Sequence, residues 1–294
     1  MKPAPFDYHA PTTVEESLEL LSEAGPDAKL LAGGQSLVPA MNFRIMQPSV
    51  LIDLNGVEGL SYIEADDDGS VRVGAMARQS EVEHSDVVAK RLPLLRQALP
   101  LIAHPQIRNR GTLGGSMVHA DPAAELPVVA VALEAEMKIM GPDGERSTPA
   151  DSFFQGMFTT EVGPDELLLE VRFPEPIANS GWSFQELARR SGDYAMAGVA
   201  AGVVLEDDGT CSQARLVYLN VGDGPIRAGT AEDLLEGKSR SDELFEEAGE
   251  KAAQDEITPY GNVHASPEYQ QHLAKVLTVR ALNQAWDEAE SQLQ

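Results

Sequence analysis

Two pairs of adjacent glycines are the residues of this sequence whose type and spacing suit a chemical task. Gly33-Gly34 follows the apolar stretch Ala28–Leu31, and Gly114-Gly115 lies within Arg110–Ser116. Glycine permits a positive φ and lets the backbone approach a ligand closely, and successive N–H groups in such turns form a concavity that binds anions. Two loops of this kind could hold both phosphates of a dinucleotide from two sides.

Three hydroxyl side chains, those of Ser36, Thr112 and Ser116, add hydrogen-bond donors to the two loops. Neither loop has the spacing G-x-G-x-x-G of dinucleotide-binding folds, and neither has the lysine of the phosphate loop G-x-x-x-x-G-K-[ST]. Each loop taken alone could equally be a tight turn without a ligand. The residues by themselves therefore allow a phosphate-binding interpretation and no more.

The elements around the first loop form one short unit. Thr13 can cap a helix that ends at Gly25-Pro26, with Glu16 at the spacing of a capping box. Hydrophobic patterning then predicts a strand over 28–31, one or two helical turns over 37–43 and a strand over 50–54. The order is thus strand, glycine loop, helix and strand.

A second unit surrounds the second loop. It begins with a strand over 71–73 and continues as mostly helical chain over 79–101, with breaks at Pro93 and Pro100. Beyond the loop we expect a helix to begin at Asp121-Pro122, where aspartate can cap and proline suits the first turn, or one turn later at Pro127. A strand over 135–140 closes the unit.

The pattern changes near Pro174–Pro176. Two strands, over 196–205 and 213–221, are separated by the hairpin signal Asp207–Gly209. From Thr230 onward the chain is predicted to be helical, with a last helix over 267–293. This part is expected to be an antiparallel sheet with helices packed on it.

Composition excludes several classes of protein. The 294 residues carry 47 acidic and 22 basic side chains, a net charge of −25, and such a surface repels nucleic acid. Only seven of the basic residues are lysine, so a protein adapted to concentrated salt, where self-repulsion is screened, is a hypothesis beside an acidic surface without special meaning.

The single cysteine, Cys211, excludes an intrachain disulfide and an iron–sulfur cluster held by this chain alone. It follows the turn Asp207–Gly209, and we expect an inert strand residue rather than a nucleophile. The histidines show no close pairing, so no metal site is expected. No apolar run has the roughly 20 residues that span a bilayer, and the N-terminus has no signal-peptide pattern, so a cytoplasmic protein is expected.

Four motifs in a fixed order along the chain say more about its family than the two glycine pairs alone. Leu31–Leu37, Ile107–Gly115, His119–Pro122 and Arg189–Ala195 resemble the flavoprotein subunit of the molybdenum hydroxylases, the family of aerobic carbon monoxide dehydrogenase and xanthine dehydrogenase. The likeness covers essentially the whole chain.

This resemblance implies an α+β fold. Two α/β subdomains, about 1–55 and 56–175, would form a vanillyl-alcohol-oxidase-like (PCMH-type) FAD-binding domain over 1–175, followed by a C-terminal domain over 176–294. The resemblance also implies an electron-transfer subunit that receives electrons on FAD. The molybdenum cofactor would lie on a large partner subunit and two [2Fe–2S] clusters on a small one, in a dimer of heterotrimers. Such partners could bring the chain to the inner face of the membrane. Substrate and electron acceptor stay open.

The resemblance assigns FAD contacts to positions in both loops and beyond them, and no catalytic residue or metal ligand. These positions are Ala32, Gly33, Gly34, Gln35, Ser36, Leu37, Ile102, Thr112, Gly114, Gly115, Asp121, Leu168 and Tyr194. Ala32–Ser36 would hold the pyrophosphate chiefly through backbone N–H groups, and Thr112, Gly114 and Gly115 would do the same from the second loop.

The remaining positions concern the sugar and the ring. Asp121 would bind a ribose or ribityl hydroxyl, although it could simply cap a helix. Ile102 and Tyr194 would flank the isoalloxazine ring, which suits apolar and aromatic side chains. The alternative for Tyr194 is a core tyrosine at the start of a strand. Leu168 would touch the edge of the flavin.

One departure from the family pattern is Gln185-Glu186, where some relatives carry a lysine before the double arginine. A cationic contact to reduced flavin or to a nicotinamide acceptor is therefore not expected, which weakens an NAD interpretation. Two other functions stay open: a stand-alone FAD-dependent reductase of the same fold type, and a binding or assembly protein without redox activity.

Overall fold

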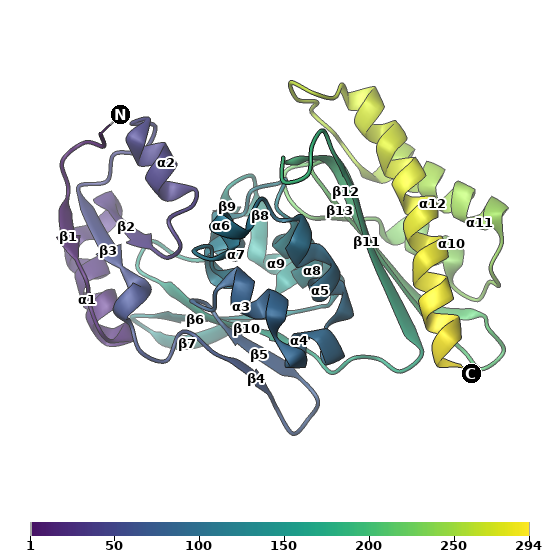
Figure 1. The fold of residues 1–294 in the computed structure, drawn as a ribbon, viewed down its shortest axis with the longest axis horizontal. Helices are drawn as coiled ribbons and strands as arrows, with labels where there is room; N and C mark the ends of the chain where they lie inside the picture. Colours follow the sequence, from purple (N-terminus) through teal and green to yellow (C-terminus); the bar gives the residue numbers. More distant parts are fainter. Residues whose placement is uncertain (1, 294) are drawn as a thin grey trace.

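The computed structural model describes residues 2–293. Three sections follow one another across the molecule, each built on its own principal β-sheet (Figure 1). The N-terminal section lies at the left of this view, and the long helix near the C-terminus lies at the right. The predicted α+β fold class is confirmed.

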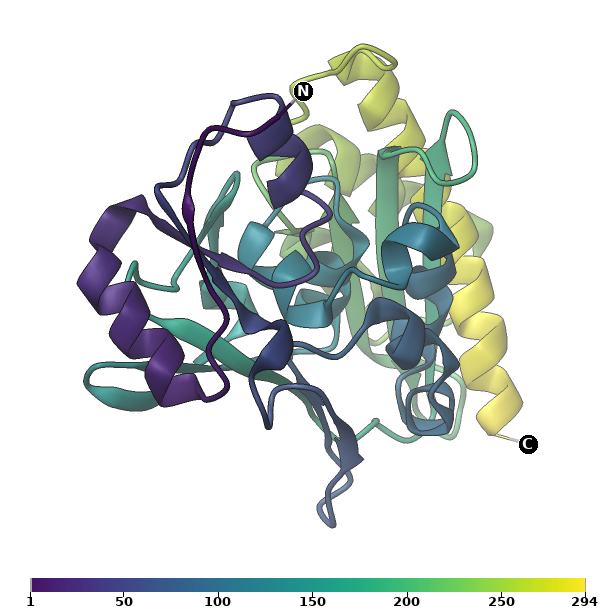
Figure 2. The same ribbon diagram turned by 60° about the vertical axis from the view of Figure 1, so that its left-hand side comes forward.

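The N-terminal section is a three-stranded parallel sheet in the order β1-β3-β2, with helices at its sides (Figure 2). Its elements are β1 (Asp7–His9), α1 (Val14–Ala24), β2 (Ala28–Leu31), α2 (Leu37–Asn42) and β3 (Val50–Asp53). Thr13 caps α1 as expected, because its hydroxyl accepts a hydrogen bond from the N–H of Glu16 at 3.1 Å. Gly25, at φ 65°, ends that helix.

The middle section has a five-stranded antiparallel sheet. Its strands, in spatial order, are β4 (Ile63–Ala65), β5 (Val71–Gly74), β10 (Leu167–Phe173), β6 (Glu136–Gly141) and β7 (Gly144–Pro149). The last strand of the section, β10, therefore lies between β5 and β6. The short strands β8 (Phe154–Gly156) and β9 (Thr159–Thr160) form a separate hairpin.

Short helices connect β5 to β6 and cover this sheet. They are α3 (Gln79–His84), α4 (Asp86–Arg91), α5 (Pro93–Ala98), α6 (Pro105–Arg108), α7 (Leu113–His119) and α8 (Glu125–Ala132), with α9 (Ala150–Phe153) after β7. The predicted break at Pro93 is confirmed, since this residue begins α5. The helix expected at Asp121-Pro122, or one turn later at Pro127, begins at Glu125, with Pro127 in its first turn. Its start is therefore shifted from Asp121 toward the second alternative.

The reason for that shift is local. Ala120 ends α7 in the left-handed region, at φ 47°, and the Asp121 carboxylate accepts a hydrogen bond from the N–H of Ala123 at 3.0 Å. The aspartate therefore caps a tight turn between two helices rather than the start of a helix.

The C-terminal section is a four-stranded antiparallel sheet with three α-helices. Its elements are β11 (Ser180–Ala188), β12 (Ala195–Leu205), β13 (Cys211–Leu219), β14 (Ile226–Arg227), α10 (Gly229–Leu235), α11 (Asp242–Lys251), a π-helical turn (Ala252–Glu256) and α12 (Pro267–Gln292). The predicted hairpin is confirmed, since β12 and β13 pair antiparallel across Asp207–Gly209.

This C-terminal sheet is buried on both faces. Ala197 and Val199 belong to the apolar cluster that includes α12, whereas Ala200 and Val217 belong to the cluster of the middle section. A strand covered on both faces has no polar side to present, which accounts for the continuous apolar run of β12. The core of the middle section thus extends onto one face of the C-terminal sheet, and a second core fills the space between the other face and α12.

Candidate cofactor site

The first glycine loop joins the carboxyl end of β2 to α2. Gly34 has φ 72°, a conformation that a side chain would strain. Five successive N–H groups, from Gly33 to Leu37, have no hydrogen-bond partner within residues 2–293. Ligands of α/β sheets bind outside the carboxyl ends of parallel strands, and this loop presents a row of free donors there.

The second glycine pair lies in the first turn of α7, not in a loop as predicted. Thr112 caps this helix, and its hydroxyl accepts the N–H of Gly115 at 3.0 Å. The N–H of Gly114 donates to the carbonyl of Ala75 at 2.9 Å. We expected free N–H donors at Thr112, Gly114 and Gly115. Among the described residues, however, only the N–H of Thr112 has no hydrogen-bond partner, so the expectation is wrong for Gly114 and Gly115.

The two loops touch each other although about 80 residues separate them in sequence. A Cβ on Gly33 would lie 2.4 Å from the carbonyl oxygen of Arg110 and 2.7 Å from the Cα of Gly111. A Cβ on Gly115 would lie 3.5 Å from that of Ala32. Gly33 is therefore required by the contact between the loops, and the tertiary structure assembles one site from both.

Polar residues that the sequence analysis did not single out surround this junction. Asp53 ends β3 beside the first loop and accepts hydrogen bonds from the hydroxyl of Tyr8 at 2.5 Å and the N–H of Asn55 at 2.9 Å. Burial acts to raise the pKa of Asp53, but these bonds and the charge of Arg110 outweigh it and lower that pKa. The position of Asp53 and Asn55 at the carboxyl end of the predicted strand over 50–54 is the signal that could have identified them.

A second group of expected residues gathers where the middle section meets the C-terminal section. Ile102 is nearly buried, and the loop before β12 packs against its neighbours, since a Cβ on Gly192 would lie 2.3 Å from the ring of His104. Tyr194 is 68% exposed, so the alternative of a core tyrosine is wrong. Partial desolvation, followed by the charges of Asp121 and Glu125, raises the pKa of Tyr194.

Two carboxyl groups beside this region are poorly solvated. Glu125, the first residue of α8, is 8% exposed, and burial and the charge of Glu186 raise its pKa to about 8. Burial raises the pKa of Glu186 to about 7, and its Oε2 atom is buried without a hydrogen-bond partner. Gln185 donates to Gln284 at 2.8 Å. The positions of the departure from the family pattern thus hold a hydrogen-bonded amide and a carboxyl group whose pKa burial raises.

Leu168 is placed differently from the other expected residues. Its side chain is 3% exposed in β10, opposite Ile139 of β6, and it belongs to the hydrophobic core of the middle section. Its strand packs against α7, so the side chain of Leu168 lies in the same core as Leu113. Cys211 is fully buried at the start of β13, and burial raises its pKa to about 11, which suits an inert thiol.

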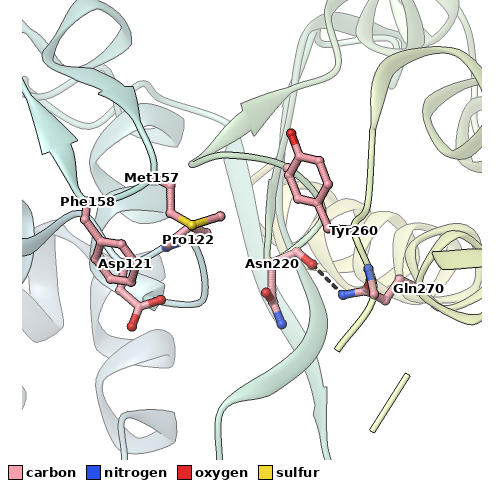
Figure 3. A pocket seen from close by; sticks show the side chains of 9 residues that line it. Asp121, Pro122, Met157, Phe158, Asn220, Tyr260 and Gln270 are labelled. Carbon is pink, nitrogen blue, oxygen red and sulfur yellow. Dashed lines mark hydrogen bonds between the residues drawn. The ribbon is translucent and has the colours of Figure 1, made fainter. Parts of the chain in front are cut away.

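A cavity of 180 Å³ lies between the middle and C-terminal sections (Figure 3). Asp121 and Phe158 face it from one side, Asn220 and Tyr260 from the other, and Gln270 donates to the carbonyl of Asn220 at 2.7 Å. Ligand pockets usually measure about 300–1,000 Å³. The volume of this cavity is below that range.

Two further findings concern the described residues as a whole. Among residues 2–293, no group of three or more histidine, cysteine or acidic side chains could hold a metal ion. None of the helices described is long and apolar enough to cross a membrane.

Comparison with known proteins agrees with this geometry. Residues 4–176 match the FAD binding domain in molybdopterin dehydrogenase, and residues 182–285 match the CO dehydrogenase flavoprotein C-terminal domain. Subunit alpha of the 6-hydroxypseudooxynicotine dehydrogenase complex of Paenarthrobacter nicotinovorans is 42% identical over 97% of this chain and 96% of its own.

Solved structures are equally similar. Carbon monoxide dehydrogenase of Hydrogenophaga pseudoflava, in a form lacking the Mo-pyranopterin moiety, superposes with a TM-score of 0.95 at 40% identity, over 98% of this chain and 99% of that one. Quinoline 2-oxidoreductase of Pseudomonas putida 86 gives a TM-score of 0.93 at 37% identity over the whole of both chains.

The fold and its paired glycine loops define a flavoprotein-type domain joined to an antiparallel C-terminal domain. The chain belongs to the family of FAD-binding subunits of molybdenum hydroxylases, which are oxidoreductase subunits. The resemblance noted from the sequence, including its PCMH-type FAD-binding fold, is confirmed.

Proposed function

We propose that this chain transfers electrons within a molybdenum hydroxylase complex. Electrons would come from [2Fe–2S] clusters on a small partner subunit and leave through FAD held by this chain to an external acceptor. The large partner would carry the molybdenum cofactor and oxidise the substrate. The medium-subunit names of relatives and the multisubunit complexes to which they belong support this assignment.

The observation that carries the proposal is the row of free N–H groups from Gly33 to Leu37 against the N-terminal end of α7. Unsatisfied donors at two touching loops suit the phosphate oxygens of a dinucleotide. When bound, FAD supplies the redox chemistry, and the protein binds it, orients it and shields it from water. No residue of this chain need act as a nucleophile.

Residue roles follow from position and stay proposals. Ala32 to Leu37 and Thr112 would hold the pyrophosphate, with Gly114 and Gly115 allowing α7 to pack closely. Asp121 would bind a hydroxyl of the ribose or ribityl chain, and Ile102 and Tyr194 would flank the ring. Leu168 would touch the edge of the flavin, although its side chain is 3% exposed. Residues 1–175 would form the FAD-binding domain and 176–294 the C-terminal domain, in a dimer of heterotrimers in the cytoplasm.

Ser36→Asp tests the phosphate assignment. Ser36 is exposed, and its side chain makes no capping bond to α2, so the substitution should leave the apoprotein folded. A carboxylate among the free N–H groups would repel the pyrophosphate and weaken FAD binding by about tenfold or more. Ser22→Asp, on an exposed position of α1, is the matched control. Equal FAD affinity of wild type and Ser36→Asp would argue against these loops as the site.

Co-purification tests the complex. Affinity isolation from the native host should recover two partner chains together with molybdenum and iron, in addition to flavin. A yellow protein isolated without partners would favour the stand-alone reductase. A colourless protein that gains no flavin absorbance with FAD would favour a binding protein without redox activity.

A further inference from the structure

A single arginine side chain connects the two glycine loops. The guanidinium of Arg78, at the entry to α3, donates from one terminal nitrogen to the carbonyl oxygen of Arg110 and from the other to Oδ1 of Asn55. The first acceptor belongs to the second loop, and the second acceptor belongs to the N-terminal section. Arg78 therefore bridges two sections of the chain.

Asn55 extends this bridge into the first loop. Its side-chain nitrogen donates to the carbonyl oxygen of Ala32 at 3.0 Å. The continuous series of hydrogen bonds thus runs from Arg110 through Arg78 and Asn55 to Ala32. Each end of the series adjoins a glycine at the junction of the loops, because Gly33 packs against Arg110 and Gly115 against Ala32.

Arg78 makes no close ion pair, although the charges of Glu81 and Asp53 act on it from farther away. Within residues 2–293, no carboxylate oxygen lies within 4.0 Å of the guanidinium nitrogens of Arg78 or of Arg110. Partial burial and the nearby charge of Arg110 lower the pKa of Arg78. Two cations that make no ion pair within 4.0 Å, beside free N–H groups and with Asp53 and Glu81 acting on them only from farther away, suit an anionic ligand at this junction.

We propose that Arg78 is a positioning residue that, through Asn55, holds the two glycine loops at the separation needed to bind a diphosphate. The inference rests on the proposed FAD site and adds a residue outside both loops to it. A guanidinium can donate in two fixed directions at once, whereas the ammonium of lysine is a compact point charge. The bridge therefore depends on the shape of the side chain as well as on its charge.

The experiment compares Arg78→Lys, Arg78→Gln, Asn55→Ala and the double variant Arg78→Lys with Asn55→Ala in the full-length apoprotein. The dissociation constant of FAD is measured by quenching of flavin fluorescence, and apoprotein melting is followed in parallel. Arg78→Lys and Asn55→Ala should each raise the dissociation constant about tenfold. The double variant should bind FAD no more weakly than the weaker-binding of the two single variants, because both changes break the same series of hydrogen bonds.

Salt dependence separates charge from geometry. Arg78→Gln should flatten the dependence of FAD affinity on salt, while Arg78→Lys should retain it. Arg96→Gln, at an exposed position of α5, changes the charge equally and should bind FAD as the wild type does. If Arg78→Gln does not fold, the FAD affinity of Arg78→Lys is compared with that of the wild type instead.

Normal FAD affinity of Arg78→Lys, or fully additive losses in the double variant, would overturn the inference. A wild-type protein that binds no FAD would instead overturn the proposed function. The two failures are therefore distinguishable.

Discussion

The N–H of Gly114 donates a hydrogen bond to the carbonyl of Ala75 at 2.9 Å, and a Cβ on Gly114 would lie 2.5 Å from the Cβ of Ala75. The first turn of α7 thus packs directly against the chain that follows β5. Gly114 is required by the fold itself, because no side chain fits between these two segments.

Gly114→Ala should therefore destabilise the apoprotein. Replacing glycine by alanine in a helix gains up to about 1 kcal/mol of helix propensity, whereas overpacking costs about 1–3 kcal/mol. The close approach to Ala75 makes the second effect larger, so the free energy of unfolding should fall in a urea titration. Gly229→Ala in α10, where a Cβ meets nothing within 4 Å, should be neutral or stabilising. A Gly114→Ala protein as stable as wild type would contradict the packing argument.

Gly33→Ala should act on the cofactor more than on the fold. Its Cβ would meet the backbone of Arg110 and Gly111 and push the two loops apart. We expect FAD affinity to fall about tenfold or more, with a smaller change in apoprotein melting than Gly114→Ala causes. Fluorescence titration measures the FAD affinity of both variants, and apoprotein melting measures their stability. A larger loss of apoprotein stability in Gly33→Ala than in Gly114→Ala would contradict the prediction.

A buried ion pair lies beside Ile102 and is hydrogen-bonded to its backbone carbonyl. The guanidinium of Arg108 binds the carboxylate of Glu83 at 2.7 Å and donates to the carbonyl oxygen of Ile102 at 2.9 Å. Arg108→Met leaves Glu83, which is 9% exposed, without a partner, and should cost about 3–5 kcal/mol of stability. The double variant Arg108→Met with Glu83→Gln should recover part of this loss in urea denaturation. No recovery would show that packing, not charge, dominates there.

Glu125 should make stability fall as pH rises. Burial raises its pKa from 4.5 to about 8, so between these values the folded protein binds more protons than the unfolded chain. The free energy of unfolding then decreases with increasing pH over this interval, by at most a few kcal/mol from this group. Glu125→Gln should flatten the decrease, while Glu19→Gln, exposed on α1, should not. Urea titrations from pH 5 to pH 8.5 measure the slopes, and parallel curves would refute the assignment.

Salt should stabilise the protein if its acidic surface is an adaptation to salt. The net charge of −25 repels itself in dilute buffer, and about 1 M salt shortens the screening length to about 3 Å. The melting temperature should then rise in 2 M KCl relative to 0.1 M KCl, and rise less with an uncharged osmolyte at equal osmolality. Equal or lower stability in salt would remove the hypothesis.

Local signals in the sequence determined many elements correctly. The capping threonine of α1, the hairpin Asp207–Gly209 and the last helix over 267–292 all depend on neighbouring residues, so patterning was sufficient. The start of α8 was displaced from Asp121 because Ala120 ends α7 in a left-handed conformation, and a residue pattern does not reveal that.

The sequence by itself determined the family, since its motifs occur in order along the chain, and it determined that two glycine pairs matter. Only the tertiary structure decided why. It brings Gly33 onto the backbone of Arg110, uses Gly114 to pack α7 and joins the loops through Arg78. These contacts join residues far apart in sequence, and their geometry depends on how three sheets pack, which no local pattern encodes.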